Sequence, residues 1–443
     1  MTPPRPPGPD GLPLLGNLRS LATEPQKFYA DVHEEYGGLA RLSVPRLEGP
    51  YLVSSPELVE QVLTTDADSF RRSRLVASLF DRTLGDGLLT SDDDHWRTGR
   101  QQAQPAFRPD RIDDYLDVMA ARTDDLLSEW EPGRTYALNE EMRRLTLLIL
   151  SDAVFGTAVD YDSERLQTMF DRIEAPGQPS NQLVAYLVPK WVPIPMWRRY
   201  NRSVAQLDAL IDDLVAQADV DGETTLLTLL KAATVSDPPV MSRERLRDEL
   251  VTFLFAGHET TATALTAALF LLDDNPEVRE RLESEVQDVL GDSEPTGDAL
   301  DELSYTEAVA KETLRLYPSA PMIPRETRES VAMDGYELPP GATVLVSQWL
   351  VHRDGTHWAD PLTFRPERWL RDTDRPEFAY FPFGAGRHRC IGEQFAMTEL
   401  QFVLASIARR YRVSIQSPAT FEVDLSISLR PTDRIAMIPE ETD

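Results

Sequence analysis

The single cysteine of this 443-residue chain lies in a segment whose composition suits an ionised thiol. Cys390 follows a loop that contains Gly384 and Gly386, and a helix is predicted to begin near Gly392. Glycines let a backbone approach a flat group closely, and the N–H groups of a helix N-terminus stabilise a thiolate. Three basic residues before the cysteine add positive potential: Arg387, His388 and Arg389. The segment therefore predicts a nucleophile or a metal ligand, with a buried inert thiol as the alternative.

The stretch Ser242–Asp273 is predicted to be a helix that is apolar on almost every side. A second group of polar residues interrupts it. Its centre reads Ala-Gly-His-Glu-Thr-Thr. Burying Glu259, Thr260 and Thr261 is costly unless they have partners. Gly257 removes a side chain, so that a flat ligand can lie against the helix, and a threonine hydroxyl can compete for backbone hydrogen bonds. Both a kinked core helix and a proton relay made of a hydroxyl and a carboxylate fit this pattern.

The elements that must position these residues are predicted to be mainly α-helical, with a small β part from both ends of the chain. We expect one domain over residues 1–443, in which 1–13 form a stiff, extended lead-in with six prolines. Helical spacing of apolar residues is clearest in seven stretches: Ala120–Trp130, Leu138–Phe155, Val204–Ala218, Ser242–Asp273, Pro276–Leu290, Ser304–Leu316 and Glu393–Tyr411. Four short runs resemble strands: Leu39–Val44, Pro50–Val53, Thr343–Val346 and Ser426–Arg430.

Composition excludes several classes of protein. One cysteine rules out an intramolecular disulfide framework and a multi-cysteine zinc site. The formal net charge of −29 argues against nonspecific binding to nucleic acid. The apolar runs are shorter than the roughly 18 residues of a membrane span, and no signal peptide is present, so we expect a soluble, cytoplasmic protein. Acidity combined with only four lysines favours adaptation to high salt, where self-repulsion is screened, over mere solubility.

The cysteine segment resembles the haem-binding loop of the cytochromes P450, the haem-thiolate monooxygenases. The family pattern Phe-x-x-Gly-x-(Arg/His)-x-Cys-x-Gly is matched by Phe383, Gly386, His388, Cys390 and Gly392. The resemblance covers essentially the whole chain from about Pro6 to Pro431. It implies the P450 fold, with haem b between the long central helix and the cysteine-loop helix. Cys390 would be the proximal thiolate ligand of the iron. The implied haem contacts in this loop are His388, on a propionate, Phe383 and Gly384.

The centre of the long helix resembles the oxygen-activation motif of the same family, Ala-Gly-x-Glu-Thr-Thr. The resemblance implies that Thr260 hydrogen-bonds dioxygen at the haem and that Glu259 connects it to a water chain. Ala256 and Gly257 would lie against the haem. His258 is expected to be a packing or surface residue.

Two further signatures concern arginines. The resemblance implies that Glu312 and Arg315, three residues apart on one helix, join Arg368 in a buried structural triad. Trp369 stands where family members usually have Phe. The resemblance also implies that the haem propionates are bound by Trp96, Arg100 and Arg325.

The resemblance also bears on the substrate and the electron donor. The resemblance places pocket walls at Leu75–Leu89, Ser319–Ile323 and Leu425–Ile427, and at single apolar positions: Leu254, Ala256, Ala320, Met322, Ile323 and Ile427. These walls favour a small lipophilic substrate, either a fatty acid or an isoprenoid-like (terpenoid) compound.

We found no flavin or iron–sulfur module in the sequence, so we expect electrons from a separate ferredoxin-type or flavodoxin-type protein and its reductase. Eight arginines lie where family members dock such partners: Arg97, Arg108, Arg111, Arg387, Arg389, Arg409, Arg410 and Arg412. The alternatives to a monooxygenase using O2 are a haem-thiolate peroxygenase or isomerase, and a non-catalytic haem-binding sensor.

Overall fold

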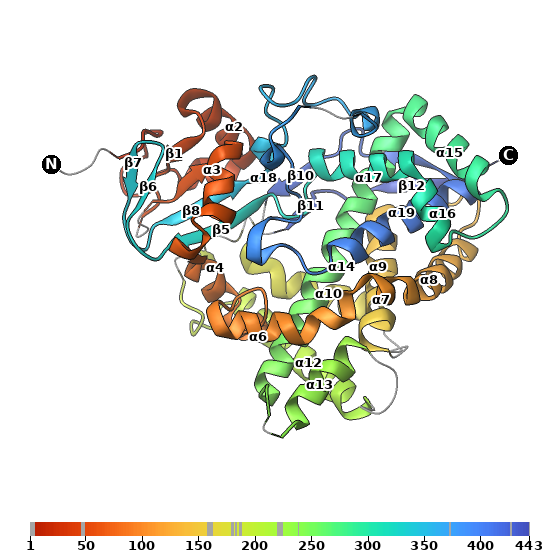
Figure 1. Ribbon diagram of the computed structural model, residues 1–443, viewed down its shortest axis with the longest axis horizontal. Coiled ribbons are helices and arrows are strands. Elements are labelled where there is room, and N and C mark those ends of the chain that lie inside the picture. The colour runs from red at the N-terminus through yellow and green to blue at the C-terminus, as the bar shows by residue number, and fades with distance from the viewer. Residues whose placement is uncertain are drawn as a thin grey trace.

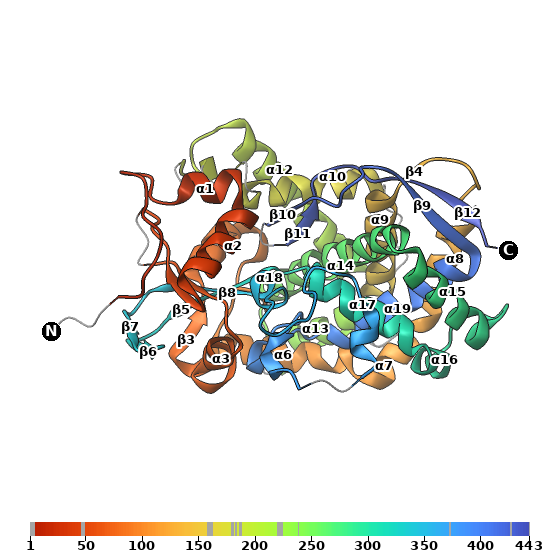
Figure 2. The same ribbon diagram turned by 90° about the horizontal axis from the view of Figure 1, so that it is seen from above.

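The computed structural model describes residues 5–45, 49–156, 163–178, 181, 184–185, 188–218, 225–237, 239–371, 374–425 and 428–442. Helices make up most of the molecule, and the largest sheet lies at the end that holds the N-terminus (Figures 1 and 2). The C-terminus lies at the opposite end in both views. The prediction of a mainly α protein with a small β part is confirmed.

The long helix α14 (Arg243–Asp274) runs through the middle of the molecule (Figure 1). The Ser242 hydroxyl accepts a hydrogen bond from the Arg245 N–H and caps the first turn. Most residues of α14 are buried, because α9 (Leu138–Phe155), α17 (Ser304–Leu316) and α19 (Glu393–Arg410) pack around it. A helix that is apolar on every side requires such cover.

The other helices surround this centre. Those before α9 are α1 (Leu18–Thr23), α2 (Pro25–Tyr36), α3 (Pro56–Glu60), α4 (Arg74–Leu79), α5 (Asp81–Leu84), α6 (Asp93–Ala103), α7 (Pro109–Asp114) and α8 (Leu116–Ser128). Those after α9 are α10 (Ser163–Glu174), α12 (Pro195–Gln217), α13 (Leu226–Val235), α15 (Pro276–Leu290), α16 (Gly297–Glu302) and α18 (Gln348–Val351).

The largest sheet has the strand order β1-β2-β8-β5-β3. It combines β1 (Leu39–Arg41), β2 (Tyr51–Val53) and β3 (Phe70–Arg72) with β5 (Met322–Thr327) and β8 (Thr343–Ser347). β2 and β8 are parallel, and the other neighbours are antiparallel. The register of β3 against β5 places Arg72 opposite Arg325, which matters for the site described below.

Three smaller sheets complete the β part. One has the order β4-β12-β9, from Tyr136–Ala137, Ala436–Glu441 and Tyr411–Ser417. The two others are hairpins, β6 (Val331–Met333) with β7 (Tyr336–Leu338), and β10 (Val423–Leu425) with β11 (Leu429–Pro431).

Local sequence signals located most elements well. The predicted helices Leu138–Phe155, Pro276–Leu290 and Ser304–Leu316 have the observed bounds. The helix expected at Val204–Ala218 begins earlier, because Pro195 supplies its first turn. Part of the run Ser426–Arg430 lies outside the described residues, and the strand there is β11. In the lead-in, the Pro7 carbonyl accepts from the Arg41 N–H at 2.8 Å, so this segment lies along β1.

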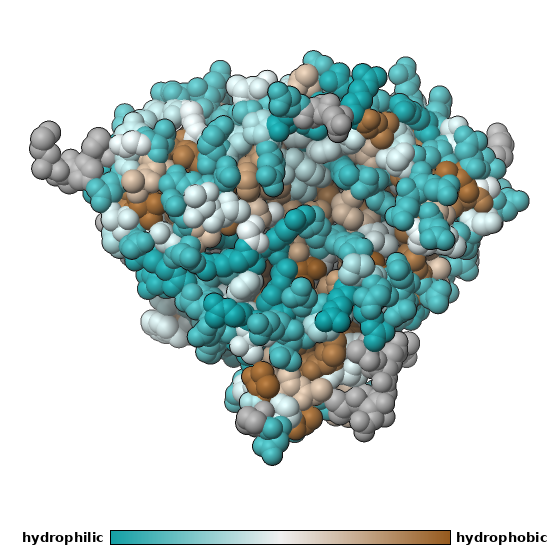
Figure 3. Space-filling model, in the orientation of Figure 1, coloured by the Kyte–Doolittle hydropathy of each residue, from teal (hydrophilic) through white to brown (hydrophobic). Residues whose placement is uncertain are grey.

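Hydrophilic side chains cover most of the surface seen in Figure 3. Hydrophobic ones gather on the lower lobe, over α12 and α13. Val235, the last residue of α13, and Val240, between α13 and α14, are among the exposed apolar residues. Within the described residues, no helix combines the length and the apolar character needed to cross a bilayer.

Candidate active site

The loop before Cys390 is held in shape by its own backbone. The Cys390 N–H donates to the Phe383 carbonyl at 2.9 Å. Gly384 and Gly386 adopt φ values of 69° and 64°, which side chains rarely allow. A Cβ at Gly386 would lie 2.0 Å from the Leu63 carbonyl oxygen, so this glycine also lets a neighbouring turn approach. Gly384 lies beside Ile323, whose Cδ1 is 3.5 Å from the corresponding Cβ position.

The ionisation of Cys390 differs from the expectation. Burial is the largest influence and raises the pKa of the thiol, although the Gly392 N–H, Arg100 and Arg389 act against it. The basic residues are partly neutralised, since Arg387 pairs with Asp68 and Arg389 with Glu393. Positive potential alone therefore does not ionise this cysteine. A nucleophilic cysteine needs a lowered pKa, whereas a bound metal deprotonates its thiol ligand outright.

The surroundings of Cys390 specify which kind of metal fits. Its side chain has accessible surface, although the protein atoms around it raise its pKa. Among the described residues, no group of three or more His, Cys, Asp or Glu side chains could hold a metal ion. A metal at this sulfur must then bring its other ligands with it, as iron does in haem.

Two arginines lie close to this loop, of which Arg325 is buried and Arg72 half-buried. Arg325 on β5 and Arg72 on β3 face each other across the sheet. Burial lowers the pKa of Arg325 to about 9 and that of Arg72 to about 10. The Arg325 Nη1 donates only to the neighbouring Pro324 carbonyl among the hydrogen bonds of the described residues. Asp92 supplies a nearby negative charge, and its carboxylate accepts from the Arg72 backbone N–H at 2.7 Å.

His388 connects β3 to the cysteine loop. Its Nδ1 lies 3.3 Å from Arg72 Nη2, and its Nε2 lies 3.5 Å from Asp92 Oδ1. Burial and the neighbouring arginines lower the pKa of His388 to about 2, so the ring is neutral and Nδ1 can accept from Arg72. The Trp96 ring packs edge-on against His388, with 4.5 Å between ring centroids.

Arg100 completes the group from α6. Its Nη1 donates to the Arg389 carbonyl at 2.7 Å, and its charge acts on Cys390. Burial lowers the pKa of Arg100 as well. The structure therefore brings together all four predicted propionate ligands: Trp96, Arg100, Arg325 and His388.

This group of residues fits a haem. Three guanidinium groups lie here, on Arg72, Arg100 and Arg325, and burial lowers the pKa of each of them. Asp92 is a negative charge near Arg72 and Arg325. Two propionate carboxylates would supply the missing negative charge. Sequence reasoning missed Arg72, because its role depends on the strand register opposite Arg325.

The centre of α14 presents a hydroxyl and a small side chain on its accessible side. Ala256 is exposed although Leu254 and Phe255 before it are buried, and Thr260, one turn later, is half-buried. The Thr260 Oγ1 donates to the Ala256 carbonyl at 2.8 Å, and the Thr260 carbonyl accepts from Ser319 at 2.7 Å. The helix stays continuous through this turn.

The expected reason for Gly257 is corrected by the structure. A Cβ at this position would lie 2.8 Å from both Leu150 Cδ atoms, so the bare side of Gly257 faces α9. The glycine lets α9 and α14 pack closely, and it is Ala256 that faces the accessible side.

Glu259 points into a buried network of charges. Its carboxylate lies 3.0 Å from the Nε atoms of Arg143 on α9 and Arg430 on β11, although neither N–H is aligned for a hydrogen bond. Arg143 and Arg430 also pair with Asp171 and Glu174 of α10. Burial raises the pKa of Glu259, with Arg143 opposing it.

The neighbouring His258 is a buried packing residue, as expected. Its Nδ1 lies 2.6 Å from the Leu254 carbonyl, and its ring packs on Phe170. Burial lowers its pKa to about 4.

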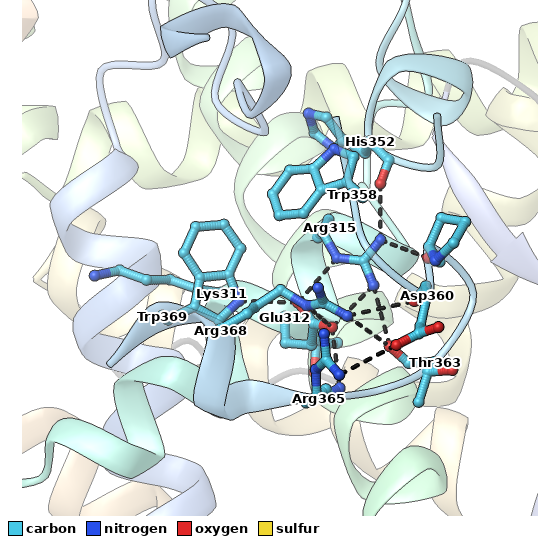
Figure 4. Close-up of polar contacts among 12 residues, drawn as sticks. Lys311, Glu312, Arg315, His352, Trp358, Asp360, Thr363, Arg365, Arg368 and Trp369 are labelled. Atoms are coloured by element: carbon cyan, nitrogen blue, oxygen red, sulfur yellow. Dashed lines mark hydrogen bonds and ion pairs between the residues drawn. The ribbon is translucent and has the colours of Figure 1, made fainter. Parts of the chain in front are cut away.

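Glu312, Arg315 and Arg368 meet in the interior (Figure 4). The Glu312 carboxylate accepts from Arg315 Nε and Nη2 at 2.9 and 2.8 Å, and from Arg368 Nε at 2.8 Å. Trp369 Nε1 donates to it at 2.9 Å, a bond that the phenylalanine usual in this position cannot make. The Arg365 N–H adds a fifth donor at 3.0 Å. Trp369 thus adds a polar contact to the triad.

The predicted pocket residues fall into three groups. Ala320, Met322 and Ile323 are each half-buried, and Ile323 lies beside Gly384 of the cysteine loop. Leu254 is only 2 % exposed and packs in the core between helices, so its assignment to the pocket is wrong: its position on α14 turns it away from the accessible side. Ile427 lies outside the described residues, as do the side chains of Leu75, Val76 and Leu79.

The predicted docking arginines are mostly paired. Seven of the eight contact carboxylates of this chain: Arg97, Arg111, Arg387, Arg389, Arg409, Arg410 and Arg412. Their charges are therefore largely compensated within the chain, and their net attraction for an acidic partner is smaller than the arginines alone suggest.

A family model decides which family these features represent. The model for cytochrome P450 matches residues 6–436. The chain belongs to the cytochrome P450 family. Its cofactor is accordingly haem with a cysteine thiolate as the proximal ligand, and Cys390 is the cysteine that the chain offers for it.

Three curated relatives illustrate what this P450 is similar to. It is 36 % identical to cyclooctatin synthase and 33 % identical to cyclooctat-9-en-7-ol 5-monooxygenase, both from Streptomyces melanosporofaciens. These matches cover 91 % of this chain and 89 % and 88 % of the relatives. It is 30 % identical to the chloroplastic protein LUTEIN DEFICIENT 5 of Arabidopsis thaliana, over 90 % of this chain and 71 % of that one. This P450 is a monooxygenase that requires O2 and a redox partner.

Proposed function

We propose that this P450 hydroxylates an isoprenoid, terpenoid-like hydrocarbon. The observation that carries the proposal is the apolar side chain beside the cysteine loop, where Ile323 keeps accessible surface next to Gly384. An apolar wall selects a lipophilic substrate. The names of two relatives, cyclooctatin synthase and cyclooctat-9-en-7-ol 5-monooxygenase, favour a terpenoid over the other lipophilic candidate, a fatty acid.

The residues have distinct tasks in this proposal. Bound haem supplies the iron centre at which dioxygen is activated. Cys390 provides its thiolate, and Arg72, Arg100, Arg325, Trp96 and His388 hold the two propionates. Thr260 holds a proton at Oγ1 on the accessible side of α14 and can exchange its bond to the Ala256 carbonyl for one to dioxygen. Glu259 is the acid that connects this hydroxyl to water. Its ion pairs with Arg143 and Arg430 fix the position of its carboxylate.

Substrate binding tests the proposed class directly. Matched panels of cyclic terpenoid hydrocarbons and of fatty acids are titrated into the ferric enzyme, and the substrate-induced spin-state shift is recorded. We expect saturable shifts with members of the terpenoid panel. Saturable binding and hydroxylation confined to the fatty-acid panel would contradict the terpenoid assignment while leaving the monooxygenase assignment intact.

Replacing Thr260 by Ala is expected to uncouple turnover. Without the hydroxyl at Oγ1, protons are delivered poorly, so product formed per NAD(P)H consumed falls about tenfold or more and hydrogen peroxide accumulates. Product, peroxide and NAD(P)H consumption are measured together in the reconstituted system.

The conservative Thr260→Ser variant is the control, because it keeps the hydroxyl, and it should remain largely coupled. Unchanged coupling in Thr260→Ala would contradict the relay and favour a peroxygenase, whose chemistry with peroxide does not need it. A protein with no turnover with any reductase or peroxide would instead support the sensor alternative.

Replacing Arg325 by Met is expected to weaken haem retention. The variant removes one of the charge-assisted bonds to a propionate, and a bond of this kind is worth about 1.5–3 kcal/mol, or roughly 10- to 100-fold in affinity. Haem transfer to an excess of a haem-scavenging apoprotein measures the loss rate. Arg72→Met should act in the same direction, and Arg97→Met, which removes an exposed arginine paired with Asp94, should leave the rate unchanged.

We infer that the electron donor is a separate ferredoxin-type or flavodoxin-type protein. Since seven docking-face arginines are already paired with carboxylates, long-range steering toward an acidic partner is weak, and close contacts must supply the specificity. The acidic, lysine-poor composition supports a role in concentrated salt, where such steering would be screened in any case.

A further inference from the structure

Two adjacent carboxylates of α14 bind the backbone of the segment that precedes α6. The Asp248 carboxylate accepts from the Asp86 N–H at 2.9 Å. The Glu249 carboxylate accepts from the Leu88 N–H at 2.8 Å. Glu249 is fully buried and also accepts from Arg245, one turn earlier on α14, at 2.9 Å. A buried carboxylate needs such donors, so the bond from the Leu88 backbone is part of what keeps Glu249 in place.

Arg247, the residue before this pair, ties the same segment to a third element. Its Nη1 donates to the Thr83 carbonyl at 2.6 Å, and its Nη2 donates to the Arg82 carbonyl at 3.2 Å. Its Nε donates to Asp208 on α12 at 2.8 Å. The Tyr200 hydroxyl of α12 is also hydrogen-bonded to the Thr83 hydroxyl, at 2.7 Å. The segment is therefore fastened to both α14 and α12.

Two glycines let the segment approach α14 this closely. A Cβ at Gly85 would lie 2.0 Å from Asp248 Oδ2, and a Cβ at Gly87 would lie 2.2 Å from Thr252 Oγ1, one turn further along α14. Gly85 ends α5 with φ 46° and ψ −129°, a conformation that side chains rarely allow. The contact therefore depends on the absence of side chains at these positions.

The bound residues belong to residues 80–92, which we call the 80–92 segment. The Phe80 carbonyl accepts from the Leu84 N–H at 2.8 Å, so Phe80 is held to the helical turn that Arg247 binds. The Phe80 ring packs against Phe255, with 5.8 Å between ring centroids. Phe255 directly precedes Ala256 on the accessible side of α14.

The other end of the 80–92 segment reaches the group of arginines that suits the haem propionates. The Thr90 hydroxyl donates to the Gly85 carbonyl at 2.7 Å and closes the turn between them. The Ser91 carbonyl accepts from Arg72 Nε at 3.1 Å, and the Asp92 carboxylate accepts from the Arg72 backbone N–H at 2.7 Å. The segment thus borders the haem site at both ends, while its middle is bound to α14 and α12.

We propose that Arg247, Asp248 and Glu249 are positioning residues, which we call the α14 clasp, that hold the 80–92 segment along α14 and so close one edge of the haem site. Release of the clasp would let Phe80 leave Phe255 and would open a path for ligands to the accessible side of α14. The clasp acts in the same way on a terpenoid and on a fatty acid, so the proposal is independent of the proposed substrate class.

Hydrogen exchange in the haem-containing enzyme tests the clasp itself. Arg247→Met removes the bonds to α5 and α12. Gly85→Ala opens the contact from the other side, because its methyl group would collide with Asp248. In both variants, peptides from the 80–92 segment should exchange about tenfold faster or more, since local opening then breaks fewer bonds.

Each variant has a matched control. Arg243→Met removes an exposed arginine one turn before Arg247 and should leave exchange unchanged. Gly291→Ala imposes comparable backbone strain, because Gly291 follows α15 with φ 53° and ψ −122°, but a Cβ there meets nothing within 4 Å. Exchange in its own peptide should accelerate less than exchange of the 80–92 segment does in Gly85→Ala.

Binding of phenylimidazole, an apolar ligand whose nitrogen binds ferric haem iron, tests the consequence for the site. Stopped-flow absorbance over a range of ligand concentrations gives the association and dissociation rate constants. Opening precedes both entry and release, so Arg247→Met and Gly85→Ala should raise both rate constants about three- to tenfold and change their ratio by less than about twofold. A merely structural defect in the pocket would change that ratio instead.

Three results would overturn the proposal. Unchanged exchange of the 80–92 segment in both Arg247→Met and Gly85→Ala would show that the clasp does not hold it. Faster exchange with unchanged rate constants would show that the segment does not close the site. A changed ratio with an unchanged association rate constant would show that the segment acts through pocket contacts. Failure of the terpenoid proposal leaves both tests intact, because neither uses a substrate.

Discussion

A Glu312→Gln variant is expected to lose about 3–5 kcal/mol of folding free energy. The Glu312 carboxylate accepts five hydrogen bonds, from Arg315, Arg368, Trp369 and the Arg365 backbone. Glu312 and Arg315 are fully buried, and the Arg368 side chain is 6 % exposed. The substitution removes the only negative charge of the triad and leaves two buried guanidinium groups without a counter-charge. Urea-induced unfolding followed by far-UV circular dichroism measures the change.

Glu307→Gln on the same helix is the matched control. Glu307 pairs with Lys311 in a partly exposed position, where an ion pair contributes at most about 1 kcal/mol. If the two variants unfold at the same urea concentration, the triad does not stabilise the fold in the way the geometry indicates. Haem spectra of the folded Glu312→Gln protein should keep their wild-type shape, because the triad makes no contact with the cysteine loop residues named above.

The Cys390→Ser variant is expected to lose the long-wavelength Soret band of the reduced, CO-bound state and all coupled monooxygenase activity. A serine hydroxyl has too high a pKa to serve as an anionic ligand in place of the thiolate, and the electron donation that favours O–O cleavage is lost. Visible spectra of the reduced protein under CO measure the first effect, and product formation measures the second.

The fold of this variant must be checked independently. Its unfolding transition should stay near that of the wild-type protein without haem, since serine is close in size to cysteine and Gly384 and Gly386 are unchanged. Arg389→Gln, which removes a neighbouring charge paired with Glu393, should keep the band. A Cys390→Ser protein that retains the thiolate-type spectrum would refute the assignment of the ligand.

Local sequence patterns were sufficient for some features. The Ser242 cap and the apolar run after it located α14, and the glycines around Cys390 located the loop, because capping and backbone conformation depend on a few adjacent residues. Likewise, Glu312 and Arg315 are three residues apart on one helix face, so their contact follows from helical geometry.

Other features depend on segments that only folding brings together. Arg72 joins Arg325 through the register of β3 against β5, and Glu259 meets Arg143 and Arg430 from two distant elements. Gly257 turned out to face Leu150 of α9, and Leu254 turned out to face the core, because the orientation of α14 is set by its neighbours.

The sequence by itself determined the chemistry of this protein: one cysteine in a glycine-rich loop before a helix, and a hydroxyl beside a carboxyl in an apolar helix. The tertiary structure decided the electrostatics, namely which charges are paired and which are left to bind carboxylates. The physical reason is that residue type and spacing act within one or two turns of chain, whereas burial and charge compensation depend on what packs against each group.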